Sequence, residues 1–184
     1  IKCSDGGPVF YRQERLTINN KPYKIFKLRT MKMNAEADTG AVISGKNDPR
    51  VTPVGRFLRR SKLDEVPQFY NVLMGDMSVV GPRSERPEFV SNFEKDIPGY
   101  SQRFAVKAGI TGLAQITGNY DTTPQDKLRY DLLYIKNYSL LQDLKIIFST
   151  VKVVITPHLY NKTFKDNQDV YIANNEVSKD EKKK

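Results

Sequence analysis

Two adjacent carboxylates, Asp64 and Glu65, have the residue types and the surroundings that phosphate chemistry needs. They lie in the segment GRFLRRSKLDEVPQFYNVLMG, residues 55–75, and follow a run of four cations, Arg56, Arg59, Arg60 and Lys62. Proline is tolerated in the first turn of a helix but not deeper inside it, so Pro67 predicts a helix that begins beside Asp64. A helix N-terminus attracts anions, which would keep Asp64 ionised and draw a phosphate to the same place.

An ionised carboxylate in such a position could act as a nucleophile toward phosphorus. Attack by an anion on a phosphate diester is opposed by charge repulsion, so the site would also need Mg²⁺ and arginines to screen the charge. Glu65 and Arg83 are candidates for this role, together with the cations before the pair. On these residues alone a second interpretation is slightly favoured, in which Asp64 caps a helix and Glu65 pairs with Arg60 or Lys62.

The composition describes one globular domain with an anionic partner. The chain has 184 residues, enough for a single core, and its 39% hydrophobic and 28% charged residues are near globular averages. The formal net charge is +9, and residues 1–60 hold 13 Lys and Arg against 5 Asp and Glu. This excess indicates a nucleic acid, a phosphorylated metabolite or an acidic lipid, or else a solvated surface. With one cysteine and one histidine, the sequence favours a hard cation held by oxygens as any bound metal.

The elements that would position these residues can be read from the periodicity. Apolar and polar residues alternate over residues 8–31 on both sides of Asn19-Asn20, which predicts a β-hairpin. Residues 34–53 have no sustained period and predict a loop. Further helices are expected over 87–96, 124–137 and 139–156. The predicted fold is therefore α+β, a mostly helical compact domain over 1–156 with a polar C-terminal tail over 157–184.

The last expected helix, SLLQDLKIIFSTVKVVIT at 139–156, is apolar over more than half of its circumference. It is expected either to pack against the core as a terminal helix or to lie as an amphipathic helix on a membrane surface. No stretch of the sequence approaches the roughly 18 apolar residues that a membrane-spanning helix needs.

Three spaced motifs occur in a characteristic order: KLRTM at 27–31, the block from Ser61 to Arg83 with the Asp-Glu pair, and GITGLAQITG at 109–118. With these motifs the sequence closely resembles the bacterial sugar transferase family, the polyprenol-phosphate phosphoglycosyl transferases of the monotopic type. The resemblance covers about residues 6–156, which is most of the chain.

The resemblance implies an enzyme, a phosphotransferase with a covalent ping-pong mechanism. Asp64 is expected to attack the β-phosphate of a UDP-sugar, which releases UMP and leaves a phosphosugar on the carboxylate. A polyprenol phosphate such as undecaprenyl phosphate then takes the hexose 1-phosphate. The product would begin the assembly of a surface glycan, such as an exopolysaccharide, a capsule, an O-antigen or a glycoprotein. Glu65 is expected to bind Mg²⁺ as the cofactor.

Further site residues follow from the same resemblance. Arg59 is expected near the bound phosphate, Arg83 of the Gly-Pro-Arg motif at the nucleotide, and Asp131 in the late helix as a catalytic residue. The remaining expected substrate-binding residues are Pro82, Lys27, Arg29 and Gln115.

The resemblance places the protein on the cytoplasmic face of the bacterial inner membrane, with room for a homodimer and without a nucleic acid partner. The family carries a hydrophobic membrane helix just before the segment that matches residues 6–8, so a longer parent protein is expected. Two other functions are kept. The charge and the aromatic residues between cations near 10–29 would suit a nucleic-acid-binding module. A catalytically idle scaffold of a glycan assembly complex is the third hypothesis.

Overall fold

The structure is a computed structural model that describes residues 1–37, 40–42, 44–45, 48–118 and 122–155. The first elements are α1 (Lys2–Asp5), β1 (Phe10–Leu16), the 3₁₀ turn η1 (Ile18–Asn20), β2 (Pro22–Leu28), α2 (Pro53–Arg60), the 3₁₀ turn η2 (Leu63–Glu65) and α3 (Gln68–Leu73). The later elements are β3 (Ser78–Val80), α4 (Pro87–Asp96), the 3₁₀ helix η3 (Tyr100–Ala105), β4 (Gly109–Thr111), α5 (Leu113–Thr117), α6 (Pro124–Lys136) and α7 (Leu140–Ile155). The expected tail over 157–184 lies outside the described residues.

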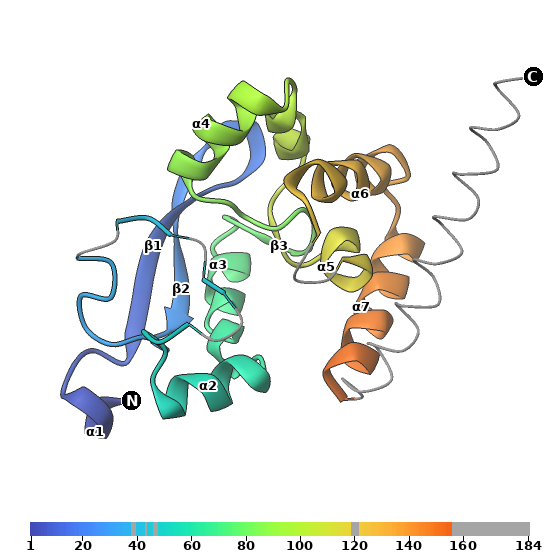
Figure 1. Ribbon diagram of the computed structural model, residues 1–184. Helices are drawn as coiled ribbons and strands as arrows, with labels where there is room; N and C mark the ends of the chain where they lie inside the picture. The colour runs from blue at the N-terminus through green and yellow to red at the C-terminus, as the bar shows by residue number, and fades with distance from the viewer. Residues whose placement is uncertain (38–39, 43, 46–47, 119–121, 156–184) are drawn as a thin grey trace, which may run out of the picture.

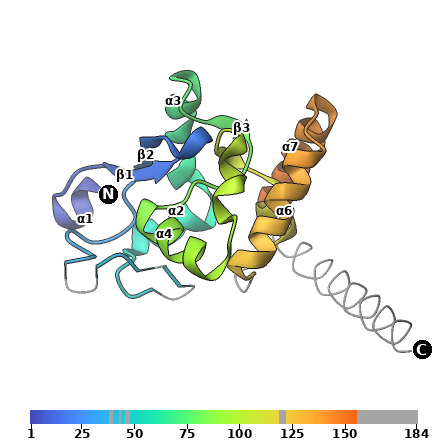
Figure 2. The same cartoon turned by 90° about the horizontal axis from the view of Figure 1, so that it is seen from above.

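The elements form two groups with a short strand pair between them. Figure 1 shows the long hairpin with α2 and α3 on one side and α5, α6 and α7 on the other, and β3 lies in the middle. The view from above in Figure 2 shows the same order, with β3 between the hairpin and α7. The site described below lies where the hairpin, the turn before α3 and the loop after β3 meet.

The predicted β-hairpin is confirmed. β1 and β2 pair antiparallel with Tyr11 opposite Lys27, Gln13 opposite Ile25 and Arg15 opposite Tyr23. These residues share one face of the hairpin because directly opposed side chains point the same way and alternate along each strand. At the turn Asn19 has a φ of 56°, in the left-handed region that asparagine tolerates better than most residues.

The chain before and after the carboxylate pair is helical in two separate pieces. Thr52 caps α2, since its hydroxyl accepts a hydrogen bond from the backbone N–H of Gly55 at 2.9 Å. After α2, Lys62 has a φ of 59°, which turns the chain out of the helix before η2. The next helix starts only at Gln68, so the expectation that it begins beside Asp64 is wrong. Pro67 lacks the N–H of a helix interior and occupies the N-cap position instead.

β3 and β4 form a parallel pair, with Ser78 opposite Gly109 and Val80 opposite Thr111. The connection between them runs through α4 and η3. Glycine is required where the two chains approach. A Cβ on Gly109 would lie 2.1 Å from the backbone nitrogen of Gly81, and one on Gly112 would lie 2.1 Å from its carbonyl oxygen. The GITG motif therefore fixes the segment that leads from β3 into Arg83.

Helices α4, α6 and α7 confirm the three later helix predictions. Ile146 of α7 packs with Val80 and Tyr134, and the Tyr134 hydroxyl donates a hydrogen bond to Asp143 at 2.8 Å, which ties α6 to α7. Much of the apolar surface of α7 is nevertheless exposed, at Leu140, Leu141, Leu144, Phe148, Val151, Val154 and Ile155. Across the described residues, none of the helices combines the length and the apolar character needed to cross a membrane.

The fold is α+β, as predicted, with an N-terminal hairpin and a mostly helical remainder. Two apolar clusters contain residues of the hairpin. One joins Leu16 of the hairpin to Tyr100 and Leu128, and the other joins Tyr23 and Ile25 to Met77. The hairpin is therefore packed against both groups of helices, and its inner face cannot shift independently of them.

Candidate functional site

Asp64 lies in η2 and is buried, with 9% of its surface exposed. Burial raises the pKa of its carboxyl group, and the charge of Glu65 acts in the same direction. Lys27, Lys62 and Arg59 are close enough to oppose this rise. Asp64 lies in a 3₁₀ turn ahead of α3 rather than at the N-terminus of α3, and burial is the largest influence on the pKa of its carboxyl group.

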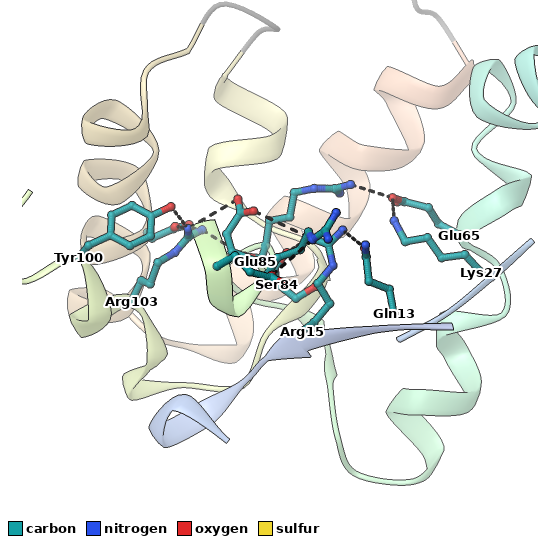
Figure 3. A network of polar contacts seen from close by, with 12 residues as sticks. Gln13, Arg15, Lys27, Glu65, Ser84, Glu85, Tyr100 and Arg103 are labelled. Atoms are coloured by element: carbon teal, nitrogen blue, oxygen red, sulfur yellow. Dashed lines mark hydrogen bonds and ion pairs between the residues drawn. The ribbon is translucent and has the colours of Figure 1, made fainter. Parts of the chain in front are cut away.

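Glu65 is held by two cations from distant parts of the chain. Its Oε1 atom lies 3.0 Å from Lys27 Nζ and 3.1 Å from Arg83 Nη2 (Figure 3). Burial alone would raise the pKa of Glu65, but the attraction of Arg83 and Lys27 outweighs it and lowers the pKa below the usual range. The same contact raises the pKa of Arg83. At neutral pH Glu65 is an anion paired with two cations.

The alternative in which the two carboxylates only stabilise a helix is wrong for the described part of the chain. Neither η2 nor α3 has a side-chain cap. The ion pairs of Glu65 are with Lys27 and Arg83 rather than with Arg60 or Lys62. Neither carboxylate therefore caps the local helix, and Glu65 pairs with cations from the hairpin and from the loop after β3.

The loop after β3 presents Arg83, whose side chain is 46% exposed and so remains open to a ligand. The carbonyl of Pro82 accepts a hydrogen bond from the N–H of Gly109 at 2.9 Å. Pro82 therefore fixes the backbone of this loop through the β4 segment. Gln115 lies in α5 and donates from Nε2 to the carbonyl of Ile110 in β4 at 2.8 Å.

Asp131 lies in α6 away from the two carboxylates of η2, and only 1% of it is exposed. Its Oδ2 atom is 2.6 Å from Nη2 of Arg103, which is equally buried. Burial raises the pKa of Asp131 to about 6, although Arg103 opposes the rise. Arg103 in turn donates from Nη2 to the carbonyl of Arg83 at 3.1 Å. Asp131 is thus linked to the Arg83 loop by way of Arg103.

Two of the expected arginines have internal partners. Arg59 donates to the hydroxyl of Thr30 at 2.9 Å and to that of Ser44 at 2.8 Å, beside the loop that follows the hairpin. Arg29 is buried and binds both carboxylate oxygens of Asp5, at 2.5 and 2.6 Å, as well as the carbonyls of Pro8 and Met31. The structure thus brings Lys27 and Arg83 to the carboxylates, whereas Arg29 ties the hairpin to α1.

Three charged residues that surround the Arg83 loop were not predicted from the sequence as site residues: Arg15, Glu85 and Arg103. Arg15 donates from Nη2 to Gln13 at 2.6 Å and from Nη1 to the carbonyl of Ser84 at 3.2 Å (Figure 3). The alternation of β1 could have indicated Arg15, because it puts positions 13 and 15 on the same face of the hairpin as Tyr23 and Ile25. No comparable period marks Glu85 or Arg103.

The residues present fit a magnesium site that a substrate completes. In the part of the chain that the structure describes, no three His, Cys, Asp or Glu side chains gather as a preformed metal cage. Mg²⁺ in phosphate-handling sites is commonly held by one or two carboxylates together with substrate phosphates. Glu65 supplies one such carboxylate beside Asp64, so the donor set is compatible with the metal.

The sequence matches the family model described as bacterial sugar transferase over residues 1–157. A UDP-N-acetylgalactosamine-undecaprenyl-phosphate N-acetylgalactosaminephosphotransferase of Aeromonas hydrophila is 42% identical over 159 residues, which cover 85% of this chain and 37% of that protein. A UDP-glucose:undecaprenyl-phosphate glucose-1-phosphate transferase of Klebsiella pneumoniae is 48% identical over 156 residues, which cover 82% of this chain and 33% of the relative.

The chain thus spans about a third of the length of these two relatives. An exopolysaccharide production protein PSS of Rhizobium leguminosarum bv. phaseoli is 40% identical over 164 residues, which cover 85% of this chain and 82% of that protein. The residues matched by the family model include the hairpin, the carboxylate pair and the Arg83 loop. The chain therefore belongs to the bacterial sugar transferase family.

Proposed function

We propose that this chain transfers a hexose 1-phosphate from a UDP-sugar to a polyprenol phosphate through a covalent intermediate on Asp64. Several relatives are named as transferases between UDP-sugars and undecaprenyl phosphate. The observation that carries the proposal is the placement of Asp64 beside Glu65, which is itself fixed by Lys27 and Arg83. This is a carboxylate nucleophile next to cations that can bind a diphosphate.

In the first half-reaction a carboxylate oxygen of Asp64 attacks the β-phosphorus of the UDP-sugar. The bond from this phosphorus to the bridging oxygen breaks, and UMP leaves with the bond's electron pair. Burial of Asp64 favours this step because a poorly hydrated carboxylate loses little solvation when it approaches phosphorus. Arg83 and Lys27 would neutralise the charge that builds up on the leaving phosphate.

Glu65 stays ionised next to Asp64, so it is the residue that would hold Mg²⁺ with the substrate's phosphates. The metal, when bound, would supply charge neutralisation at the diphosphate without taking part in proton transfer. Arg59 is close enough to influence the pKa of Asp64 and would add a positive charge at the far side of the turn.

In the second half-reaction a phosphate oxygen of the polyprenol phosphate attacks the same phosphorus. The Asp64–phosphorus bond breaks, the carboxylate is regenerated, and a polyprenol-diphosphate sugar is the product. Such an acceptor is dissolved in a membrane. Exposed apolar side chains on α2 and α3, including Phe57, Phe69 and Leu73, would bring the turn with Asp64 to that surface. We place the protein on the cytoplasmic face of the bacterial inner membrane, because UDP-sugars are made in the cytoplasm. Its product would enter surface glycan assembly.

The test is UMP release from a UDP-sugar with and without polyprenol phosphate. We expect Mg²⁺-dependent release by the chain, its loss on chelation, and no release by Asp64→Asn. Asp96→Asn, an exposed aspartate at the end of α4, is the matched control and should retain activity. An Asp64→Asn protein with normal turnover would contradict the assignment of the nucleophile.

A further inference from the structure

We propose that Arg103, neutralised by Asp131, is a positioning residue that holds Arg83 in place against Glu65. This inference rests on the proposed function, because Arg83 is assigned there to the leaving phosphate. Arg103 is 1% exposed, and its Nη2 atom lies 2.6 Å from Asp131 Oδ2. The same nitrogen donates to the carbonyl oxygen of Arg83 at 3.1 Å. Arg103 therefore meets the backbone, rather than the side chain, of Arg83, and Asp131 meets Arg103.

The backbone at this point is held from two sides. Arg103 holds the carbonyl of Arg83, and Arg15 holds the next carbonyl, that of Ser84, at 3.2 Å. Glu85 lies between the two guanidinium groups, with Oε1 3.8 Å from Arg103 Nη1 and Oε2 3.9 Å from Arg15 Nη1. Figure 3 shows Glu85 and Ser84 between Arg103 and Arg15. Consecutive carbonyls are thus fixed by two arginines that share one carboxylate.

The geometry of Arg103 explains why its role is to position. Its fork-shaped guanidinium can bind Asp131, the Arg83 carbonyl and the Tyr100 hydroxyl at the same time, which an ammonium group would do less well. A buried cation without a carboxylate partner is strongly destabilising, which accounts for Asp131. Figure 3 shows Arg103 and Glu65 at opposite ends of the polar network. Asp131 therefore acts through Arg103 and does not meet the reacting phosphate.

Arg103 would affect the reaction through the position of Arg83. Its side chain is 46% exposed and reaches Glu65 at 3.1 Å, so packing around the guanidinium does little to fix it. Its place depends on the backbone that carries it. A misplacement of about 1 Å in a group that stabilises charge lowers the rate by up to about 100-fold.

The experiment is a double-mutant cycle on UMP release, with Arg103→Lys and Asp131→Asn each made in the wild-type and in the Arg83→Ala background. We expect each single substitution to lower kcat/KM by about 10- to 100-fold in the wild type. In the Arg83→Ala background, where there is no guanidinium to place, the further loss should be less than about 2-fold. Equal losses in both backgrounds would overturn the inference, since they would show a role independent of Arg83.

A second readout does not depend on turnover. The Arg83 Nε–H resonance in a ¹⁵N spectrum of the wild-type chain, assigned by its loss in Arg83→Ala, should move toward that of a solvated arginine in Arg103→Lys. Arg129→Lys, an exposed arginine on α6, should leave it in place. An unchanged Arg83 signal in a folded Arg103→Lys protein would also overturn the inference. A wild-type chain that releases no UMP would contradict the proposed function, while this spectrum would still decide the positioning role.

Discussion

At the scale of single residues, Glu65 determines how the site is charged. Two cations converge on one of its oxygens, and one of them, Lys27, is 38 residues away in the sequence. Burial lowers the pKa of Lys27, and the attraction of Glu65 opposes this. Lys27 and Arg83 are therefore held beside Glu65 before any substrate arrives, and this group of charges is preorganised for a phosphate.

Lys27→Met should lower kcat/KM for UMP release by about 100-fold, because one charge that stabilises the leaving phosphate is removed. The control is Lys24→Met on the same strand. Lys24 is exposed. Because side chains alternate along a strand, Lys24 lies on the face of β2 opposite to that of Lys27. Comparable losses in both variants would show that the effect comes from overall charge and not from the contact with Glu65.

Asp131 gives a prediction about stability and pH. Burial raises its pKa from 3.8 to about 6, so between these values the folded chain binds a proton that the unfolded chain has released. As the pH rises through this window, the stability of the wild type should fall relative to Asp131→Asn, by on the order of 2–3 kcal/mol. Chemical denaturation of both proteins from pH 4 to 8 measures this difference. A difference that stays constant with pH would contradict the raised pKa.

At the scale of elements, the parallel pair of β3 and β4 carries the Arg83 loop. Its closeness depends on glycine, since a Cβ on Gly109 would lie 2.1 Å from the nitrogen of Gly81. Gly109→Ala should therefore lower the free energy of unfolding by about 1–3 kcal/mol or more. It should also reduce UMP release, because the loop would shift.

The matched control for that substitution is Gly45→Ala, since an added Cβ there would meet no atom within 4 Å. Its free energy of unfolding should change by less than about 1 kcal/mol. If urea denaturation gives the same free energy of unfolding for both variants, the close approach of the two backbones is not what stabilises the pair of β3 and β4.

The elements also show what could be predicted from the sequence. The hairpin and the helices α4, α6 and α7 carry clear periods, and all were predicted. The parallel pair was not, because strands of three residues leave no period and their partners are separated by α4 and η3. The start of α3 was placed too early, since the left-handed turn at Lys62 has no mark in the sequence.

The same limit applies to the site. The motifs pointed to Asp64, Glu65 and Arg83, but the partners of Glu65 come from strands and loops that only the tertiary fold brings together. Arg103 was missed because a buried arginine looks like a surface cation until its partner on α6 is known.

At the scale of the whole molecule, large apolar side chains are exposed on α2 and α3 and again along α7. Leu73 is 85% exposed and Phe148 is 72% exposed, which is unusual for such large apolar residues in a protein surrounded by water. Together with a net charge of +9, they suit a surface that meets anionic lipid.

The chain should therefore bind vesicles that contain anionic lipid, and Leu73→Glu should weaken this binding several-fold because it removes apolar contact area and adds a negative charge. Co-sedimentation with vesicles of phosphatidylglycerol and phosphatidylethanolamine measures it. Asn92→Glu, at an exposed position of α4, adds the same charge without loss of apolar area. Equal weakening by both variants would show that net charge, and not the apolar group, sets the binding.

In the proposed reaction Asp64 carries the sugar phosphate. Its most direct test is mass spectrometry of the chain after incubation with a UDP-sugar and Mg²⁺ in the absence of polyprenol phosphate. We predict a hexose-phosphate adduct on the peptide that contains Asp64, absent in Asp64→Asn and lost when polyprenol phosphate is added. An active chain that shows no adduct, or an adduct that persists in Asp64→Asn, would contradict the account.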